Sequence, residues 1–370
     1  MSCFHFIGIY RVLETKGVQI TMLNIKKNML TTKSVLVFGY FGKKSNIQEG
    51  QSVKTRNMSR LFKEMGCNVE EFDTESFRYD KLAFFKMIRQ LFKCKKLCLL
   101  PAYHNLKFFF PILFVFSKLF RYDIYLFTIG GRLHIYLKSL PIHRWMMRRI
   151  KCVFNETHML GNYLHDIHGF NNLEYCPNVK FVSFSPQKYH TNGELHLVFL
   201  ARIIMEKGID VIFGYADWLS KQSRNNVTID FYGMVNSKDK DYFEKQIEKY
   251  KFVTYKGVAQ QSDIPQALEK YDAMLFPTHY PTEGIPGSVI DAYISGIPVI
   301  ASDWTYAREL IEDGKTGIII PFEDNQEIFN SVCEELLNDT EKLNRLKDYA
   351  RLRAVEYHAD NAKKILRKYF

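Results

Sequence analysis

The residues best suited to chemistry in this sequence lie between positions 272 and 303, where a carboxylate stands on each side of a glycine-rich turn. These carboxylates are Glu283 and Asp291. Between them, Gly284-Ile285-Pro286-Gly287-Ser288 predicts the start of a helix, with the Ser288 hydroxyl as its N-cap. Apolar runs on both sides of this region predict buried strands. A strand, a glycine-rich loop and a helix N-terminus together form an anion site at the edge of a parallel sheet.

A phosphate group suits such a helix N-terminus because the unpaired N–H groups there carry partial positive charge. The two carboxylates would repel a phosphate, so they need a different partner. Sugar hydroxyls are such a partner, since a carboxylate accepts strong charge-assisted hydrogen bonds from them. The pattern therefore predicts a ligand with both phosphate and sugar, a nucleotide-sugar. The alternative is an ordinary helix cap with two solvated acids.

Two cations stand in a second segment, ARIIMEKGIDVI at residues 201–212. The planar guanidinium of Arg202 and the compact ammonium of Lys207 could hold a diphosphate and offset its charge as it leaves. The alternative is a salt-bridged helix start. A third segment, GQSVKTR, begins at Gly50 after the first predicted strand, and we expect a solvated helix face for its Arg56.

These segments resemble the signature of glycosyltransferase family 4, whose members have the GT-B fold. The signature has Glu, seven residues and a second Glu, and Glu283 and Asp291 hold these two positions here. EGIPGSVIDAYISGIPVIASDW is most similar to the branch that builds bacterial surface polysaccharides. The other two segments resemble further motifs of the family. The resemblance covers nearly the whole chain from about residue 34, and the sequence departs from the signature at Asp291, one methylene shorter than Glu.

The resemblance implies a retaining hexosyltransferase that needs no cofactor and no divalent metal. In this role Arg202 and Lys207 hold the diphosphate, Glu283 the sugar and Asp291 the ribose. Further donor-binding positions are Gly50, Gly233, Gly284, Ile285, Pro286, Gly287 and Ser288. His104, at the end of a predicted strand, is the candidate catalytic residue of the acceptor side, with a chance placement as the alternative.

Alternating strand and helix patterns predict an α/β protein with parallel sheets. The expected architecture is GT-B, with two Rossmann-like domains that face each other across a cleft. Residues 1–33 form a leader of uncertain role, residues 34–185 the acceptor-side domain and residues 186–357 the nucleotide-sugar domain. The resemblance implies that a terminal helix, residues 358–370, packs back on the first domain.

The net charge of +11 is concentrated in the first half of the chain. Residues 1–185 hold 28 lysines and arginines against 12 acids, whereas residues 186–370 hold 23 against 28. A basic half can serve nucleic acid, an anionic membrane or solubility alone. No nucleic-acid module is present, so we expect a membrane surface as partner and no nucleic acid.

Two predicted helices of this basic half are candidates for membrane contact. Residues 79–93 carry apolar side chains along one side and cations around much of the remainder: Leu82, Phe85, Ile88, Leu91 and Phe92, against Lys81, Lys86, Arg89 and Lys93. The alternative is a core-facing helix with solvated lysines. Residues 106–120 predict a strongly apolar helix packed on the sheet, and no segment is long and apolar enough to span a bilayer.

We therefore expect a cytoplasmic enzyme, peripheral on the inner face of the membrane, that transfers a sugar to a lipid-linked or oligosaccharide acceptor. The seven cysteines show no metal-ligand spacing, which indicates a reducing compartment. Asp239 and Asp241 match the DxD metal motif of the GT-A fold, but they lie in a charged helix, so no metal is predicted. The open alternatives are a basic nucleic-acid-binding protein and a non-catalytic GT-B partner subunit.

Overall fold

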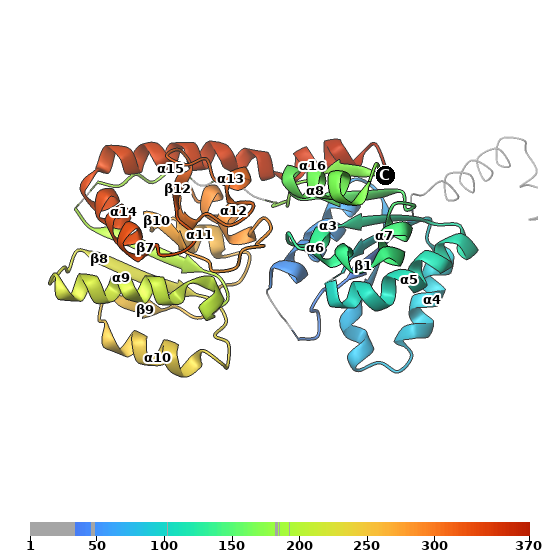
Figure 1. The fold of residues 1–370 in the computed structure, drawn as a ribbon, viewed down its shortest axis with the longest axis horizontal. Helices are drawn as coiled ribbons and strands as arrows, with labels where there is room; N and C mark the ends of the chain where they lie inside the picture. Colours follow the sequence, from blue (N-terminus) through green and yellow to red (C-terminus); the bar gives the residue numbers. More distant parts are fainter. Residues whose placement is uncertain (1–33, 46–48, 102, 182–183, 185, 192) are drawn as a thin grey trace, which may run out of the picture.

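The computed structural model describes residues 34–370 except 46–48, 102, 182–183, 185, 192 and the side chain of His104. The predicted leader, residues 1–33, lies outside the described residues. Within these limits the chain forms two six-stranded sheets, each flanked by helices (Figure 1).

The first sheet has the strand order β2-β1-β3-β4-β5-β6, and every pair of neighbours is parallel. Its domain contains these elements in chain order: β1 (Ser34–Gly39), α3 (Gly50–Glu64), β2 (Asn68–Asp73), η1 (Thr74–Arg78), α4 (Ala83–Lys93), β3 (Lys96–Leu100), α5 (Tyr103–Phe120), β4 (Asp123–Phe127), α6 (Leu133–Lys138), α7 (Pro141–Met147), β5 (Cys152–Asn155), α8 (His158–His168) and β6 (Leu173–Tyr175).

The second sheet has the order β12-β11-β10-β7-β8-β9, again parallel throughout. The remaining elements are β7 (Leu195–Leu200), η2 (Met205–Lys207), α9 (Ile209–Lys221), β8 (Val227–Tyr232), α10 (Lys240–Lys249), β9 (Val253–Tyr255), α11 (Ile264–Leu268), β10 (Ala273–Phe276), α12 (Gly287–Ile294), β11 (Val299–Ser302), α13 (Ala307–Leu310), β12 (Gly317–Ile320), α14 (Gln326–Asn338), α15 (Thr340–Ala354), η3 (Val355–Tyr357) and α16 (Ala359–Leu366).

Both sheets are doubly wound, and this confirms the predicted fold class of two Rossmann-like domains. In each sheet the chain winds outward in both directions from a central pair of strands, β1 and β3 in the first sheet and β7 and β10 in the second. Ligands of such sheets bind beyond the carboxyl ends of that central pair. The loops after β7 and β10 are therefore where the second domain is expected to hold its ligand.

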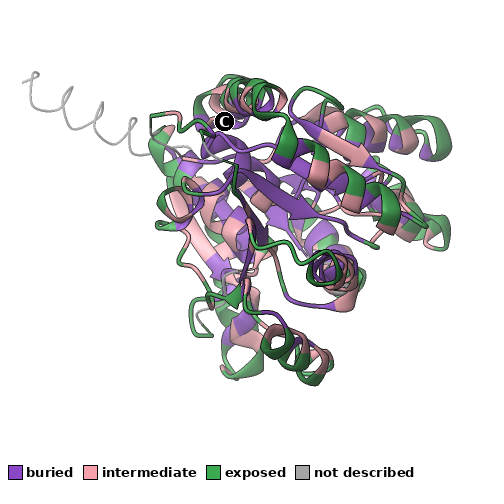
Figure 2. Cartoon of the chain, turned by 90° about the vertical axis from the view of Figure 1, so that its left-hand side faces the viewer, coloured by how far each residue is buried: buried purple, intermediate pink, exposed green. Residues whose placement is uncertain are grey.

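The central strands of each sheet are mainly apolar runs because helices cover both faces. In Figure 2 the buried strands lie at the centre and the helices expose their outer faces. The last helix packs in the core of the first domain, where Ala362 and Leu366 of α16 lie with Val35 and with Phe62 of α3. This helix follows a backbone crossing, where Lys180 and His358 form a parallel β-bridge.

Helix α4 differs from its prediction in its start and in its buried face. It begins at Ala83, after the 3₁₀ turn η1, and its buried residues are Ala83, Met87 and Leu91. Three side chains of the predicted apolar side are exposed, namely Leu82, Phe85 and Phe92. The apolar sector of this helix is therefore wider than the sector that the first core covers.

Candidate functional site

The loops after β7 and β10 bring together two residues that the sequence predicted to act on one ligand. Lys207 is the last residue of η2, and Glu283 lies in the loop between β10 and α12. The Lys207 ammonium contacts the Glu283 carboxylate and lies 5.3 Å from the centre of the Phe276 ring. Only 13% of the Lys207 side chain and 17% of the Glu283 side chain are exposed. A partly buried ion pair thus marks the expected ligand position of the second domain.

Arg202, like Lys207, follows strand β7, but its side chain is exposed to solvent. Among the described residues, its side chain has no hydrogen-bond or ion-pair partner, so an anionic ligand would meet little competition for it. The loop that carries it is fixed by Gly233, whose φ of 146° lies in a region that favours glycine. A Cβ at Gly233 would come within 1.7 Å of the Ala201 carbonyl oxygen. The glycine at position 233 therefore lets its backbone pass close to the loop that carries Arg202.

Helix α12 starts at Gly287 and has Pro286 at its N-cap position, with no side-chain cap. The predicted Ser288 cap is wrong because the N-cap position is Pro286, two residues earlier, which makes Ser288 the second residue of the helix. The helix ends at Ile294 with Ser295 as its C-cap, and Gly296 follows with a φ of 70° and an N–H that donates to the Tyr293 carbonyl.

Asp291 forms an ion pair with a lysine that no sequence pattern had indicated. The Lys180 ammonium lies 2.7 Å from the Asp291 carboxylate, and the two side chains are only 7% and 5% exposed. Burial raises the pKa of Asp291, while the charge of Lys180 acts in the opposite direction. Lys180 itself precedes the second domain and forms the β-bridge with His358. The ion pair therefore ties α12 to the backbone crossing between the domains.

The Lys180 ammonium also lies close to the start of α12. A Cβ built on Gly287 would stand 3.6 Å from the Lys180 nitrogen. The helix start where we predicted a phosphate therefore has a lysine beside it already. This lysine comes from a part of the chain about a hundred residues away, so no local motif pointed to it.

Backbone of the first domain packs directly on the loop that carries Glu283. A Cβ at Gly284 would come within 2.6 Å of the Gly130 Cα atom. The Gly131 N–H donates to the Thr282 carbonyl at 3.3 Å, and the Tyr306 hydroxyl donates to the Gly131 carbonyl at 2.8 Å. Glycines are needed on both sides because the two backbones approach so closely. The loop after β4 thus lies against the loop that carries Glu283.

A buried ion pair of the first domain lies behind this contact. The Lys54 ammonium contacts the Glu156 carboxylate and donates to the Thr128 carbonyl at 2.7 Å. Glu156 also accepts from the Gly130 N–H at 3.2 Å. Helix α3 thus turns the Lys54 side chain into the protein. Sequence reasoning missed Glu156, whose one signal is its place directly after β5.

Arg56, also on α3, is half-buried and its guanidinium donates to the Phe41 carbonyl. The prediction that it would lie on a solvated face is therefore wrong. Burial lowers the pKa of Arg56, against the nearby charge of Asp73. The helix start of the GQSVKTR segment is thus anchored to the domain by both of its cations.

The domains are also joined by a helix cap. Glu309, in the short helix α13, accepts from the backbone N–H groups of His158 and Met159 at the start of α8. A carboxylate at a helix N-terminus is favourable because of the partial positive charge there. Here the helix belongs to the first domain and the carboxylate to the second, so the cap stabilises the contact between them.

Three other predicted positions contribute less to this arrangement. Gly50 opens α3, and a Cβ there would meet no heavy atom within 4 Å. Ile285 is buried, and its carbonyl accepts from the Asn178 side chain at 3.4 Å. His104 lies in the first turn of α5, but its side chain lies outside the described residues.

Within the described ranges, no three His, Cys, Asp or Glu side chains form a group that could hold a metal ion. Asp239 instead accepts from the N–H of Met205, the first residue of η2, at 3.3 Å. One residue of the DxD triplet therefore supports the loop of Lys207.

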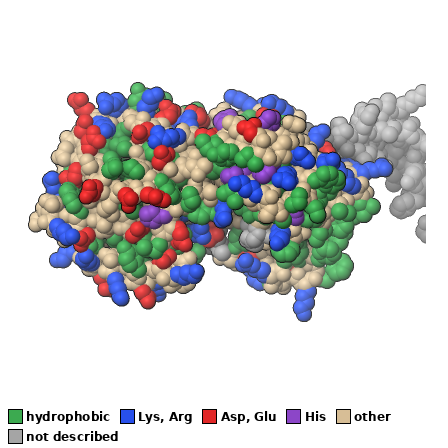
Figure 3. Space-filling view, viewed as in Figure 1, with side chains coloured by type: hydrophobic (Ala, Val, Ile, Leu, Met, Phe, Trp, Pro, Cys, Tyr) green, Lys and Arg blue, Asp and Glu red, His purple; other side chains and the backbone are tan. Residues whose placement is uncertain are grey.

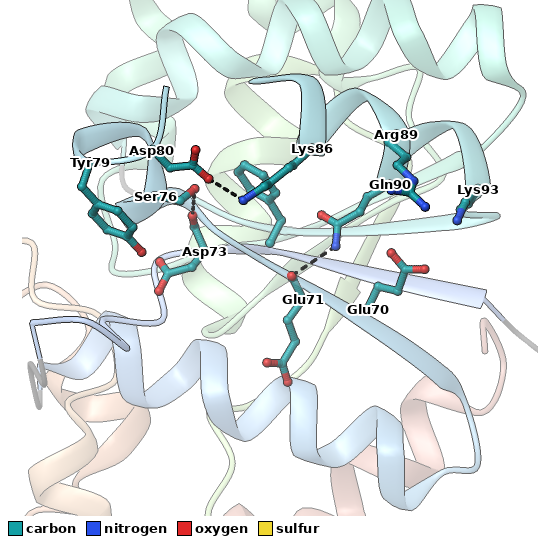
Figure 4. Close-up of a pocket in the computed structure, with 11 residues that line it drawn as sticks. Glu70, Glu71, Asp73, Ser76, Tyr79, Asp80, Lys86, Arg89, Gln90 and Lys93 are labelled. Atoms are coloured by element: carbon teal, nitrogen blue, oxygen red, sulfur yellow. Dashed lines mark hydrogen bonds and ion pairs between the residues drawn. The ribbon is translucent and has the colours of Figure 1, made fainter. Parts of the chain in front are cut away.

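A pocket of about 550 Å³ lies elsewhere, between the edge strand β2 and helix α4 (Figure 4). Acids of β2 line one side and cations of α4 the other, and Lys86 forms an ion pair with Asp80. Burial alone would raise the pKa of Glu71, but hydrogen bonds from Lys43, Lys63 and Ser59 lower it to about 2. This pocket is separate from the predicted donor residues, none of which lines it.

Comparison with known proteins bears on the second domain most directly. Residues 183–353 match the family model described as Glycosyl transferases group 1. An uncharacterized 41.2 kDa protein in the cps region of Klebsiella pneumoniae is 29% identical over 138 residues, 36% of this chain and 35% of that protein. The alpha-D-kanosaminyltransferase of Streptomyces kanamyceticus is 26% identical over 167 residues, 44% of this chain and 42% of that enzyme. The matches thus span less than half of either relative.

The fold likeness extends over both domains. The crystal structure of Anabaena HepE in complex with UDP superposes with a TM-score of 0.70, at 15% identity. The superposition covers 90% of this chain and 98% of that one.

Proposed function

Because residues 183–353 match the group 1 glycosyl transferases and the described chain has the GT-B fold, we propose that the protein is a glycosyltransferase with a nucleotide-sugar donor. The contact between Lys207 and Glu283 is the observation that carries this proposal. It combines a cation suited to phosphate with a carboxylate suited to sugar hydroxyls, at the ligand-binding edge of the second sheet.

The donor would lie along the loops after β7 and β10. Arg202 and Lys207 would hold the diphosphate, with the N–H groups at the start of α12 facing the same oxygens. Glu283 would bind the sugar, and the diphosphate would compete with this carboxylate for Lys207. Asp291 would accept from the ribose, which then shares the carboxylate with Lys180.

Transfer would retain the anomeric configuration by attack on the same face from which the phosphate leaves. The anomeric C–O bond to phosphate breaks, a bond to the acceptor oxygen forms, and the leaving phosphate takes the acceptor proton. Arg202, Lys207 and the dipole of α12 would offset the charge that develops on the diphosphate. No divalent metal enters this proposal.

The acceptor would bind on the first domain, near the loop that contains Gly130 and Gly131 and with His104 as catalytic candidate. We propose a hexose-type sugar and a lipid-linked or oligosaccharide acceptor in surface polysaccharide synthesis. The Klebsiella relative in a cps region supports a role in surface polysaccharide synthesis, and the kanosaminyltransferase supports transfer of a hexose-type sugar. Reaction at the inner face of the cytoplasmic membrane would follow.

A thermal-shift screen against UDP-, GDP-, ADP- and CMP-sugars tests the donor site. UDP-sugars come first because the Anabaena protein is seen in complex with UDP. A donor at about a hundred times its Kd should stabilise the fold by ~2.7 kcal/mol, or roughly 5–10 °C for a domain of this size. Lys207→Ala should abolish the shift, whereas Lys221→Ala, at an exposed lysine of α9, should keep it.

Different results would favour other functions. No shift with any sugar-nucleotide, together with salt-sensitive binding to DNA or RNA, would replace the proposal with a nucleic-acid-binding protein. Donor binding without sugar transfer or donor hydrolysis would leave a non-catalytic partner subunit.

A further inference from the structure

Most of the solvent face of α5 is apolar, with Lys107 and Lys118 as its exposed cations. Phe108, Ile112, Val115 and Leu119 repeat at helical spacing, and all four are exposed, three of them by more than 60%. Leu106, Phe110 and Leu113 on the opposite face are fully buried in the first core. A surface helix that only covers a sheet carries polar residues on its outer face. This helix therefore has a second apolar face that nothing among the described residues covers.

Neighbouring helices continue this face. Phe85 and Phe92 of α4 are 68% and 70% exposed, and the Phe92 ring packs edge-on against Phe120 of α5 at 5.5 Å. On the other side, Trp145 of α7 packs against Phe114 of α5 at 5.9 Å. Figure 3 shows apolar side chains gathered over this part of the first domain, with lysine and arginine around them. The exposed residues of α4, α5 and α7 thus form one surface, named here the apolar face.

The charged residues around the apolar face are almost all cationic. Residues 81–155 contain fifteen lysines and arginines and a single acid, Asp123. Two of the cations lie on the face itself, since Lys118 lies 5.0 Å from the Phe114 ring and Arg149 4.2 Å from the Trp145 ring. Long cationic side chains above apolar rings are typical of interfaces where the charge stays in a polar layer.

We propose that this face docks on an anionic lipid bilayer. The bilayer supplies both an apolar phase for the exposed side chains and negative head groups for the cations. A nucleic acid would use only the cations and would leave the apolar row of α5 in water. No helix of the described chain is long and apolar enough to cross a membrane, so the contact is with the surface.

The cations of α4 have a different position from the one that its sequence pattern implied. Lys86, Arg89 and Lys93 line the pocket beside β2, opposite its acids (Figure 4). Their charge is therefore partly offset within the domain. Lys118 and Arg149 lie on the apolar face instead, and Lys107 is exposed on α5 next to Phe108, so the test below changes these three.

Docking through the first domain would present the acceptor side to the lipid surface and leave the acidic second domain in solution. This link to a lipid-presented acceptor rests on the proposed function, while the docking itself does not. The two are separable, because donor binding is measured without membranes and vesicle binding is measured without donor.

Co-sedimentation of the full chain with vesicles at low salt tests the docking. We expect binding to vesicles of phosphatidylcholine with phosphatidylglycerol and none to phosphatidylcholine alone. A triple variant with Phe108, Val115 and Leu119 changed to serine should bind at least tenfold more weakly. A second triple variant, Lys107→Glu, Lys118→Glu and Arg149→Glu, should lose roughly fivefold or more for each charge and lose its salt sensitivity.

A matched control changes Met234, Val258 and Ile328 to serine, three exposed apolar side chains of the second domain. This control should bind vesicles as the unchanged chain does, and all variants should keep their donor-induced thermal shift. No vesicle binding by the full chain, or equal binding by the serine variant of the face, overturns the proposal. A dimer that the serine variant abolishes, without vesicle binding, would assign the face to a second copy instead. If vesicle binding appears only after residues 1–33 are removed, that segment would be the occupant of the apolar face in the full chain.

Discussion

The buried contact between Lys180 and Asp291 makes a strong prediction about stability. In Lys180→Met the carboxylate keeps its buried position but loses its cation. Breaking a buried ion pair by removing one partner costs ~3–5 kcal/mol, because the remaining charge stays uncompensated. For a domain of this size that corresponds to a drop in melting temperature of roughly 6–20 °C.

The size of this loss should depend on pH. Burial already raises the pKa of Asp291, and removal of the cation raises it further above the value of an unfolded carboxyl. The folded variant therefore holds a proton that the unfolded chain releases, so its stability falls as pH rises from about 4 toward the raised pKa. The difference in melting temperature between Lys180→Met and the unchanged chain should be larger at pH 8 than at pH 5.

Two further variants separate the ion pair from other effects. Lys180→Met with Asp291→Leu removes both charges and should recover most of the loss, since apolar replacement of a buried pair is often neutral. Lys188→Met breaks a contact with Glu269 whose lysine is 61% exposed, and it should cost less than about 1 kcal/mol. Equal melting temperatures for Lys180→Met and the unchanged chain at pH 8, or a double variant as unstable as the sum of both singles, would refute the reasoning.

The remaining predictions concern the donor site, the domain contact and pH. Arg202→Ala and Lys207→Ala should each lower turnover by ~10²–10³, measured as initial rates with an identified donor, since leaving-group charge would be unshielded. Activity should survive EDTA; loss on chelation that Mg²⁺ or Mn²⁺ restores would contradict a metal-independent mechanism. Gly284→Ala places a Cβ within 2.6 Å of first-domain backbone, so turnover should fall by roughly 10²-fold, while Gly193→Ala, with nothing within 4 Å of its Cβ, should have no effect. Glu71→Gln should lower the melting temperature most above pH 4.5, because the native carboxyl stays ionised down to about 2 while the unfolded one protonates near 4.5. The difference between the two proteins should therefore shrink as pH falls through this window, and a constant difference would contradict the assigned pKa.

Local patterns were enough to predict the strands at the site. The apolar runs on both sides of the glycine-rich turn are the buried strands β10 and β11, as predicted, because a strand covered on both faces is a continuous apolar run. Lys207 and Glu283 follow from the same logic, since each stands shortly after such a strand and strands of a parallel sheet end at one edge. These positions need only short-range information.

Helical periodicity predicted fewer features of the structure than the apolar runs did. It identified the apolar residues of α4 but not whether another layer covers them, and Phe85 and Phe92 remained exposed. It also could not fix the first residue of α12 and so misassigned the role of Ser288. Helix limits depend on backbone geometry at the preceding residue, here Pro286, and on the tertiary contacts that hold it.

Partners that lie far apart in the chain were decided by the tertiary structure alone. Lys54 meets Glu156, Lys180 meets Asp291, and Glu309 caps α8 over separations of 102, 111 and about 150 residues. A lysine in a sequence carries no mark of the carboxylate it will meet, because that choice depends on how two sheets and their connections bring distant strand and helix ends together. A buried charge must be paired wherever the fold places it, so the sequence supplied the charged groups and the packing of the two domains determined which of them meet.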